Sequence, residues 1–125
     1  MGIMSGLMGN SSAIDKEEAV KKLKDVLFEG ESVEHAYKLI RDMIVFTNSR
    51  LILVDIQGMT GTKVDYHSIP YKSITHFKTE TAGSFNMDAE LKIFLSGSEL
   101  PIENTFKKGN SILDVQKLLA SYVSR

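Results

Sequence analysis

Two apolar runs flank a short polar turn in the stretch MIVFTNSRLILVDI, residues 43–56. Residues 43–46 and 51–54 are aliphatic apart from one phenylalanine, and Thr47, Asn48 and Ser49 lie between the two runs. Aliphatic β-branched and aromatic residues favour strands, and Asn and Ser favour turns through local hydrogen bonds. The stretch therefore predicts a β-hairpin.

Further short strands are predicted on both sides of this hairpin. They cover residues 32–40, 63–68, 73–81, 90–95 and 100–106, most of which alternate apolar with polar side chains. Pro70 is expected to interrupt the strand pairing, because proline has no N–H group to donate to a ladder. Pro101 indicates that the last strand lies at an edge of the sheet.

Helical periodicity is confined to regions near the two ends of the chain. Asp15, with Glu18 three residues later, forms the pattern of a capping box, and the helix that follows is expected to end at Gly30. The second helix is predicted over residues 111–123. Its apolar stripe consists of Ile112, Val115, Leu118, Leu119, Tyr122 and Val123.

This order of elements predicts a mainly β (α+β) protein with about seven strands, an N-terminal helix and a C-terminal helix. No helical segment separates the strands, so an antiparallel arrangement is expected. Such a meander must curl to bury one face, which predicts a bent antiparallel barrel capped by the C-terminal helix. We expect residues 14–125 to form one domain, preceded by a tail over residues 1–13.

The composition excludes several classes of function. Fifteen basic and sixteen acidic residues give a formal charge of −1, which argues against a nucleic-acid partner and against general attraction to an anionic membrane. The chain has no cysteine, so disulfides, thiolate catalysis and cysteine-ligated zinc are excluded. The N-terminus has no basic region before its apolar residues, and a secretory signal is therefore not expected.

Several segments, taken together and in order, resemble the bacterial pleckstrin-homology (PH) family. They are GLMGN at 6–10, YKLIRD at 37–42, FTNSRLILVD at 46–55, QGMTGTK at 57–63, SIPYKSI at 68–74, ETAG at 80–83 and DAELK at 88–92. The resemblance covers nearly the whole chain. It implies a PH-like barrel, a cytoplasmic bacterial protein, no enzymatic activity, and assembly into ring-like homo-oligomers. Lipid-binding members of the wider superfold use a basic loop between the first two strands, whereas residues 40–43 here carry only Arg41, beside Asp42.

The tail carries the first candidate site. Ile3, Met4, Leu7 and Met8 would share one face of a helix, and apolar residues without a partner in the domain are typical of an interface. The alternative interpretation is a flexible terminus. A weaker candidate is an anion site at Lys107, Lys108 and Asn110, because free N–H groups at the start of a helix favour anions.

No catalytic motif is present. The chain lacks a Gly-x-Ser-x-Gly elbow and phosphate-binding loops, and its three histidines fall on separate predicted strands without metal-ligand spacing. We therefore expect no enzyme, no cofactor and no metal. The favoured function is a self-associating binding module that can also hold another protein through a strand edge. The alternative is a domain that binds an anionic lipid headgroup or another small anion.

Overall fold

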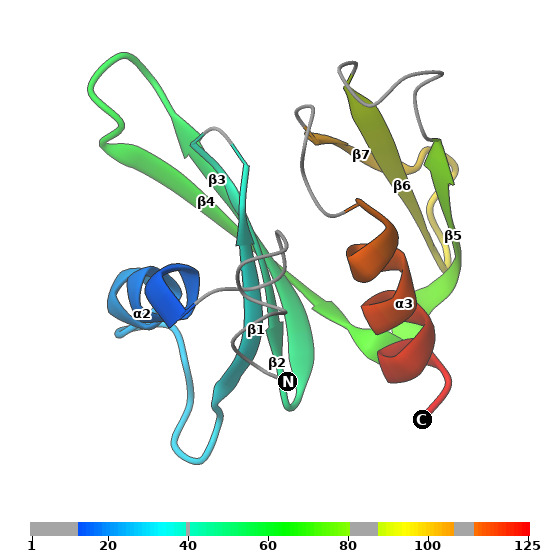
Figure 1. Cartoon of the computed structure of the whole chain (residues 1–125), viewed down its shortest axis with the longest axis horizontal. Coiled ribbons are helices and arrows are strands. Elements are labelled where there is room, and N and C mark those ends of the chain that lie inside the picture. Colours follow the sequence, from blue (N-terminus) through cyan, green and yellow to red (C-terminus); the bar gives the residue numbers. More distant parts are fainter. Residues whose placement is uncertain (1–12, 40, 81–87, 107–111) are drawn as a thin grey trace. The chain divides into compact units, whose positions relative to one another are not determined.

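The computed structural model describes residues 13–39, 41–80, 88–106 and 112–125, without the side chains of Ala13 and Ile14. The chain divides between Pro70 and Tyr71 into two compact units. Each unit contains one antiparallel sheet (Figure 1).

The first unit is built on a four-stranded sheet in the order β1-β2-β3-β4. Its strands are β1 (Val33–Lys38), β2 (Met43–Thr47), β3 (Arg50–Gln57) and β4 (Lys63–Pro70). The predicted hairpin is β2–β3, in which Val45 lies opposite Ile52 and Phe46 opposite Leu51. All five residues of β2 are buried, as are residues 51–54 of β3. Burial from both sides explains why these strands are continuously apolar rather than alternating.

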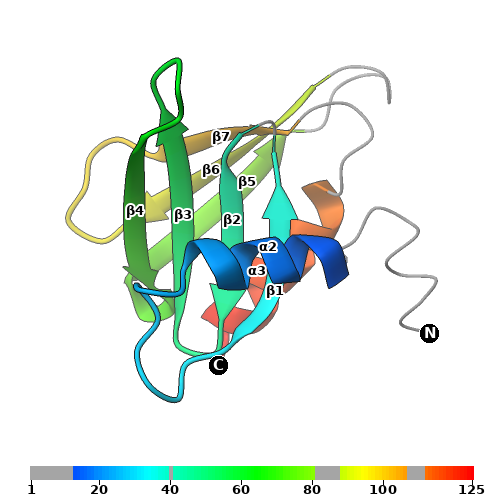
Figure 2. The same ribbon diagram turned by 90° about the vertical axis from the view of Figure 1, so that its left-hand side faces the viewer.

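The helix α2 (Ala13–Lys22) lies across one face of this sheet (Figure 2). Ala19, together with Leu23 just beyond the helix, is fully buried against Ala36, Val45 and Ile52. The opposite side of the helix is charged. The apolar side of α2 therefore packs on the sheet, because each Å² of apolar surface removed from water stabilises the folded state by about 25 cal/mol.

Two local predictions for the first unit were wrong. The helix ends at Lys22 rather than at Gly30, and the chain continues through turns in which the Val26 and Leu27 amides both donate to the Leu23 carbonyl. Val26 and Leu27 still pack on the core, but the Val26 carbonyl accepts a hydrogen bond from Arg50, which competes with helical bonding. The predicted alternation along residues 32–40 also fails. An irregularity after Val33 changes the register of β1, and its neighbouring residues 36 and 37 are both buried.

A buried ion pair joins the connection before β1 to the β2–β3 hairpin. Arg50 Nε donates to Glu31 Oε2 and Arg50 Nη2 donates to Glu31 Oε1, both at 2.9 Å. The Thr47 hydroxyl donates to Glu31 Oε2 at 2.7 Å, and the Phe28 amide donates to Oε1 at 3.2 Å. The Glu31 side chain has no exposed surface. Burial by itself raises the pKa of Glu31, but the hydrogen bonds from Arg50, Thr47 and Phe28 and the charge of Arg50 outweigh burial and lower that pKa.

The second unit begins with a 3₁₀ turn, η1 (Tyr71–Ser73), immediately after Pro70. Its sheet has the order β5-β6-β7, with β5 (Ile74–Glu80), β6 (Ala89–Leu95) and β7 (Ile102–Phe106). The predicted break at Pro70 is confirmed, because Pro70 is the last residue of β4. The edge position that Pro101 predicted for the final strand is confirmed too.

The helix α3 (Ile112–Val123) packs on β5, β6 and η1 (Figure 1). Its buried residues are Ile112, Val115, Leu119 and Tyr122, which belong to the predicted stripe. Tyr122 stacks on Tyr71 with ring centroids 4.7 Å apart, and the Arg125 guanidinium lies 4.1 Å from the centre of the Tyr122 ring. Periodicity alone was sufficient to identify the face that this helix buries.

The predicted fold class is confirmed: seven antiparallel strands lie between an N-terminal and a C-terminal helix. The strands form two antiparallel sheets, of four and three strands, rather than the single curled sheet that was predicted. The assignment of residues 14–125 to one domain stays a prediction. Among the described helices, none is long and apolar enough to cross a membrane.

Candidate functional site

Both candidate sites proposed from sequence lie outside the described residues. These are the interface residues Ile3, Met4, Leu7 and Met8 and the anion-site residues Lys107, Lys108 and Asn110. Both remain predictions.

The first unit contains a hollow of about 500 Å³ between α2 and the turns that follow β1 and β3. Its described lining residues come from α2, from β1 and the connection after it, and from β3 and the turn after it. They are Glu18, Lys22, Lys38, Arg41, Ile56, Met59, Thr60 and Gly61. With three basic side chains and one acidic side chain, the described lining carries two net positive charges.

Arg41 links the two turns at this hollow. Its Nη2 donates to the Gly58 carbonyl at 2.6 Å, so the guanidinium of the β1–β2 connection is held against the β3–β4 turn. A Cβ placed on Gly61 would lie 3.3 Å from the same nitrogen. Gly61 also has a φ of +69°, a conformation that residues with side chains rarely adopt. The backbone conformation therefore favours glycine at position 61, and a side chain there would also press on the guanidinium.

The two lysines of the hollow differ in their surroundings. Lys38 Nζ lies 3.1 Å from Glu18 Oε2, in a pair that is partly exposed on both sides. Within the described part of the chain, Lys22 forms no ion pair. Lys22 is the last residue of α2, where the negative end of the helix dipole favours a cation. Glu18 therefore compensates the charge of Lys38, whereas no carboxylate in the described part of the chain pairs with Lys22.

An open sheet edge is the second notable feature of the first unit. β4 pairs with β3 along all eight of its residues, and no described strand pairs with its other side. Residues 65–68 of β4 are exposed in succession. Because successive strand residues point to opposite faces, this run leaves both faces of the edge strand uncovered. An edge of this kind offers free backbone groups to another strand.

The described histidines form no metal site. Within the first sheet, His35 on β1 and His67 on β4 lie at opposite ends of the strand order. Burial, followed by the nearby charge of Lys16, lowers the pKa of His35. In the second unit, His76 is stacked on Phe94 at 4.1 Å. No group of three potential ligands occurs among the residues that the structure describes.

The family model for the bacterial PH domain matches residues 2–123 of this chain. The chain belongs to the bacterial PH domain family. Its relatives include the uncharacterized protein YjqA of Bacillus subtilis (strain 168), which is 55% identical over 122 residues covering 97% of this chain and 98% of YjqA.

Two solved structures support the assignment of this PH domain. A pleckstrin homology domain from Shewanella amazonensis SB2B is 48% identical, with a TM-score of 0.83 and coverage of 98% of both chains. A DUF1696 family protein with a pleckstrin-homology domain, from Shewanella loihica PV-4, is 49% identical. Its TM-score is 0.76, and the match covers 92% of this chain and 98% of that one. The resemblance inferred from sequence is thereby confirmed.

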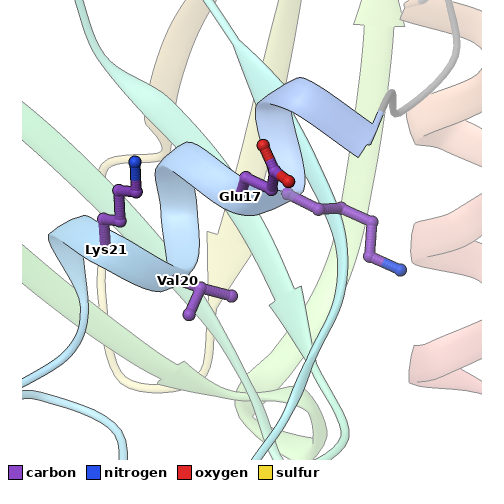
Figure 3. A pocket seen from close by; sticks show the side chains of 4 residues that line it. Glu17, Val20 and Lys21 are labelled. Carbon is purple, nitrogen blue, oxygen red and sulfur yellow. The ribbon is translucent and has the colours of Figure 1, made fainter.

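A second depression, of about 490 Å³, lies on the outward side of α2 in this PH domain. Its described lining is Lys16, Glu17, Val20 and Lys21, all from one helix (Figure 3). Val20 is 48% exposed there. A single helix face offers a ligand contacts from one side only, so these four residues do not by themselves enclose one.

Sequence reasoning missed the hollow because it considered the β1–β2 connection alone. That connection carries only Arg41, beside Asp42, and so differs from the basic loop of the lipid-binding members. In the structure Asp42 Oδ1 accepts a hydrogen bond from the Ile56 amide at 2.9 Å, and Asp42 does not line the hollow. The glycines of the QGMTGTK turn were the available signal for a close approach of another group to the backbone.

Proposed function

We propose that this PH domain is a non-catalytic binding and assembly module that associates with further copies of itself. The observation that carries the proposal is the open β4 edge, which is exposed on both faces over residues 65–68. Pairing of β4 with a different surface of the next copy would be head-to-tail, and such contacts form a ring when the rotation closes. In this proposal the protein acts as a cytoplasmic, ring-like scaffold.

Charges on β4 support specific pairing over aggregation. Lys63 and Asp65 carry opposite charges on one exposed strand, and Pro70 ends it. Charged residues and proline at an edge suppress unspecific strand addition, so the strand accepts only a partner whose charges match. Tyr66, which follows Asp65 and is 40% exposed, supplies the aromatic surface that is enriched where protein interfaces gain affinity.

Light scattering after size-exclusion chromatography tests the proposal at high micromolar concentration. We expect a mass that is a multiple of the 13.9 kDa chain. Tyr66→Lys adds a positive charge at the edge without removing a core residue, and we expect dissociation at concentrations about tenfold higher than for the wild type, which corresponds to about 1.4 kcal/mol. Asp25→Asn changes the charge equally at an exposed turn and serves as the control.

Deletion of residues 1–13 separates the two candidate interfaces. Loss of assembly in Tyr66→Lys but not in the deletion supports β4. Loss in the deletion alone assigns the contact to the tail and overturns the role of β4. A wild-type protein of 13.9 kDa at every concentration refutes self-association altogether.

A further inference from the structure

We propose that the outward face of α2 is a docking surface for residues 3–8 of the same chain. The described lining of the depression on this face is Lys16, Glu17, Val20 and Lys21. None of these residues lies on β4, so the inference is independent of the strand edge on which the proposed self-association rests. A depression that one helix lines from one side suits a second segment lying along that helix better than a small molecule, which needs enclosing walls.

Val20 is the apolar centre of this surface. Its side chain is 48% exposed and projects from the helix (Figure 3). The surface around Val20 is mainly apolar, because Lys16 and Lys21 contribute their methylene stems while their ammonium groups stay in water. The lining positions 16, 17, 20 and 21 have the spacing i, i+1, i+4, i+5, which the apolar tail residues share: Ile3, Met4, Leu7 and Met8. Each set therefore forms one stripe along a helix, and the two stripes match in length.

The tail suits an apolar surface because residues 1–13 include no charged side chain. Covering the depression with this segment therefore buries no ionised side chain of the tail, which would be costly. Six residues are too few to form a stable helix alone in water, and Gly6 weakens a helix further. Residues 3–8 therefore need a surface to pack on, and α2 is the element that follows them directly in the chain.

The connection between the two segments fits a helical hairpin. Residues 9–12, Gly-Asn-Ser-Ser, separate Met8 from Ala13, the first residue of α2. Helical hairpins use loops of about 2–5 residues, and Gly, Asn and Ser favour turns. Along a helix Ile3 lies about 7.5 Å from Met8, and Val20 lies about 10 Å from Ala13, so an antiparallel tail would bring Ile3 within one turn of Val20.

Docking on the same chain is favoured over docking on a second copy. A linker this short gives the tail an effective concentration of about millimolar at its own helix, which exceeds the concentration of other copies in dilute solution. A tail held in this way covers the apolar surface around Val20, and it is not free to join two copies. The inference therefore gives residues 3–8 a covering role and leaves association between copies to β4.

Disulfide trapping in the full chain tests the docking, because the chain has no cysteine of its own. With Met4→Cys and Glu17→Cys together, we expect mild oxidation to form a disulfide within one chain, since bridged Cα atoms lie about 4.4–6.8 Å apart. Met4→Cys with Asp25→Cys is the control pair, because Asp25 is exposed in the turns beyond α2. The control pair should form its disulfide about tenfold more slowly, because the chain must move to join it.

Val20→Asn, added to the Met4→Cys and Glu17→Cys chain, tests the apolar contact itself. Valine and asparagine have similar helix propensities, so the substitution removes apolar surface without weakening α2. We expect disulfide formation to slow by about two- to fivefold, because the tail loses part of the apolar area that it covers. Phe28→Asn makes a similar change at another exposed apolar side chain, 54% exposed and outside the described lining, and should leave the rate unchanged.

The mass of the oxidised protein without reductant identifies the occupant of the surface. Disulfides that join two chains would show that the tail docks on a second copy and would overturn docking on its own chain. Equal rates for the two cysteine pairs, or equal slowing by Val20→Asn and Phe28→Asn, would overturn the surface itself. A chain that is monomeric in light scattering but forms the disulfide within one chain supports this inference while it refutes self-association, so the two proposals can fail separately.

Discussion

Replacing Glu31 by glutamine is the sharpest test of what holds the first unit together. Glu31 accepts hydrogen bonds from Arg50 Nε, Arg50 Nη2, the Thr47 hydroxyl and the Phe28 amide. These contacts join the connection before β1 to the β2–β3 hairpin. Glutamine keeps the shape of the side chain but replaces one acceptor oxygen by an NH₂ group, which faces donors.

The expected loss of stability follows from the geometry. Hydrogen bonds to charged groups contribute about 1.5–3 kcal/mol each, and breaking a fully buried ion pair costs about 3–5 kcal/mol. The Arg50 side chain retains 22% exposure, so water compensates part of its charge. We therefore expect the free energy of unfolding to fall by about 3 kcal/mol. For a chain of this size, that corresponds to a melting temperature about 12 °C lower.

Urea denaturation at neutral pH and at about pH 3 measures both the loss and its electrostatic origin. The pKa of Glu31 is lowered in the folded state from its ordinary value of 4.5. The stability that its ionisation contributes is therefore present above about pH 4.5 and lost as the pH falls through the lowered folded pKa. The difference between wild type and Glu31→Gln should accordingly shrink in acid.

Glu29→Gln is the matched control, because it makes the same chemical change at an exposed position two residues earlier. This control should stay within about 0.5 kcal/mol of the wild type. A Glu31→Gln variant that is as stable as the wild type would refute the structural role of the ion pair. A loss that is the same at both pH values would refute its dependence on the charge of Glu31.

Two other substitutions test the core and the turn. Leu119→Ala, at a fully buried position of α3, should lower the unfolding free energy by about 3 kcal/mol in a urea titration. The control Leu113→Ala, at a position 56% exposed, should change it by less than about 1 kcal/mol. Equal effects of the two substitutions would show that the buried face of α3 is wrongly assigned. Gly61→Ala and Gly58→Ala should each cost about 1 kcal/mol because both residues have positive φ, at +69° and +82°. Gly61→Ala should cost somewhat more than Gly58→Ala, since its Cβ would lie 3.3 Å from Arg41 Nη2 while nothing lies within 4 Å of a Cβ at Gly58. Equal losses of unfolding free energy in the two variants would contradict the close approach of Arg41 to Gly61.

Local sequence determined most of the secondary structure of this PH domain. The apolar runs of residues 43–46 and 51–54 predicted the central hairpin, because burial of both sides excludes polar residues from it. The 3.6-residue periodicity of the last helix predicted its buried face. Pro70 predicted the break between β4 and β5, since its missing N–H group is a property of the residue itself. The family was identified from an ordered set of such segments.

Tertiary structure decided the features that depend on distant residues. Helix α2 ends at Lys22, and Arg50, far along the chain, ties the turns that follow it to the hairpin by donating to the Val26 carbonyl. The partnership of Glu31 with Arg50 also has no local signature, as the two residues are separated by a helix-to-strand connection and a hairpin. In the same way, Lys22, Lys38 and Arg41 look like scattered surface charges in the sequence. Only the packing of α2 on the sheet, with two turns beside it, brings their charges to one hollow, because electrostatic attraction depends on distance in space rather than along the chain.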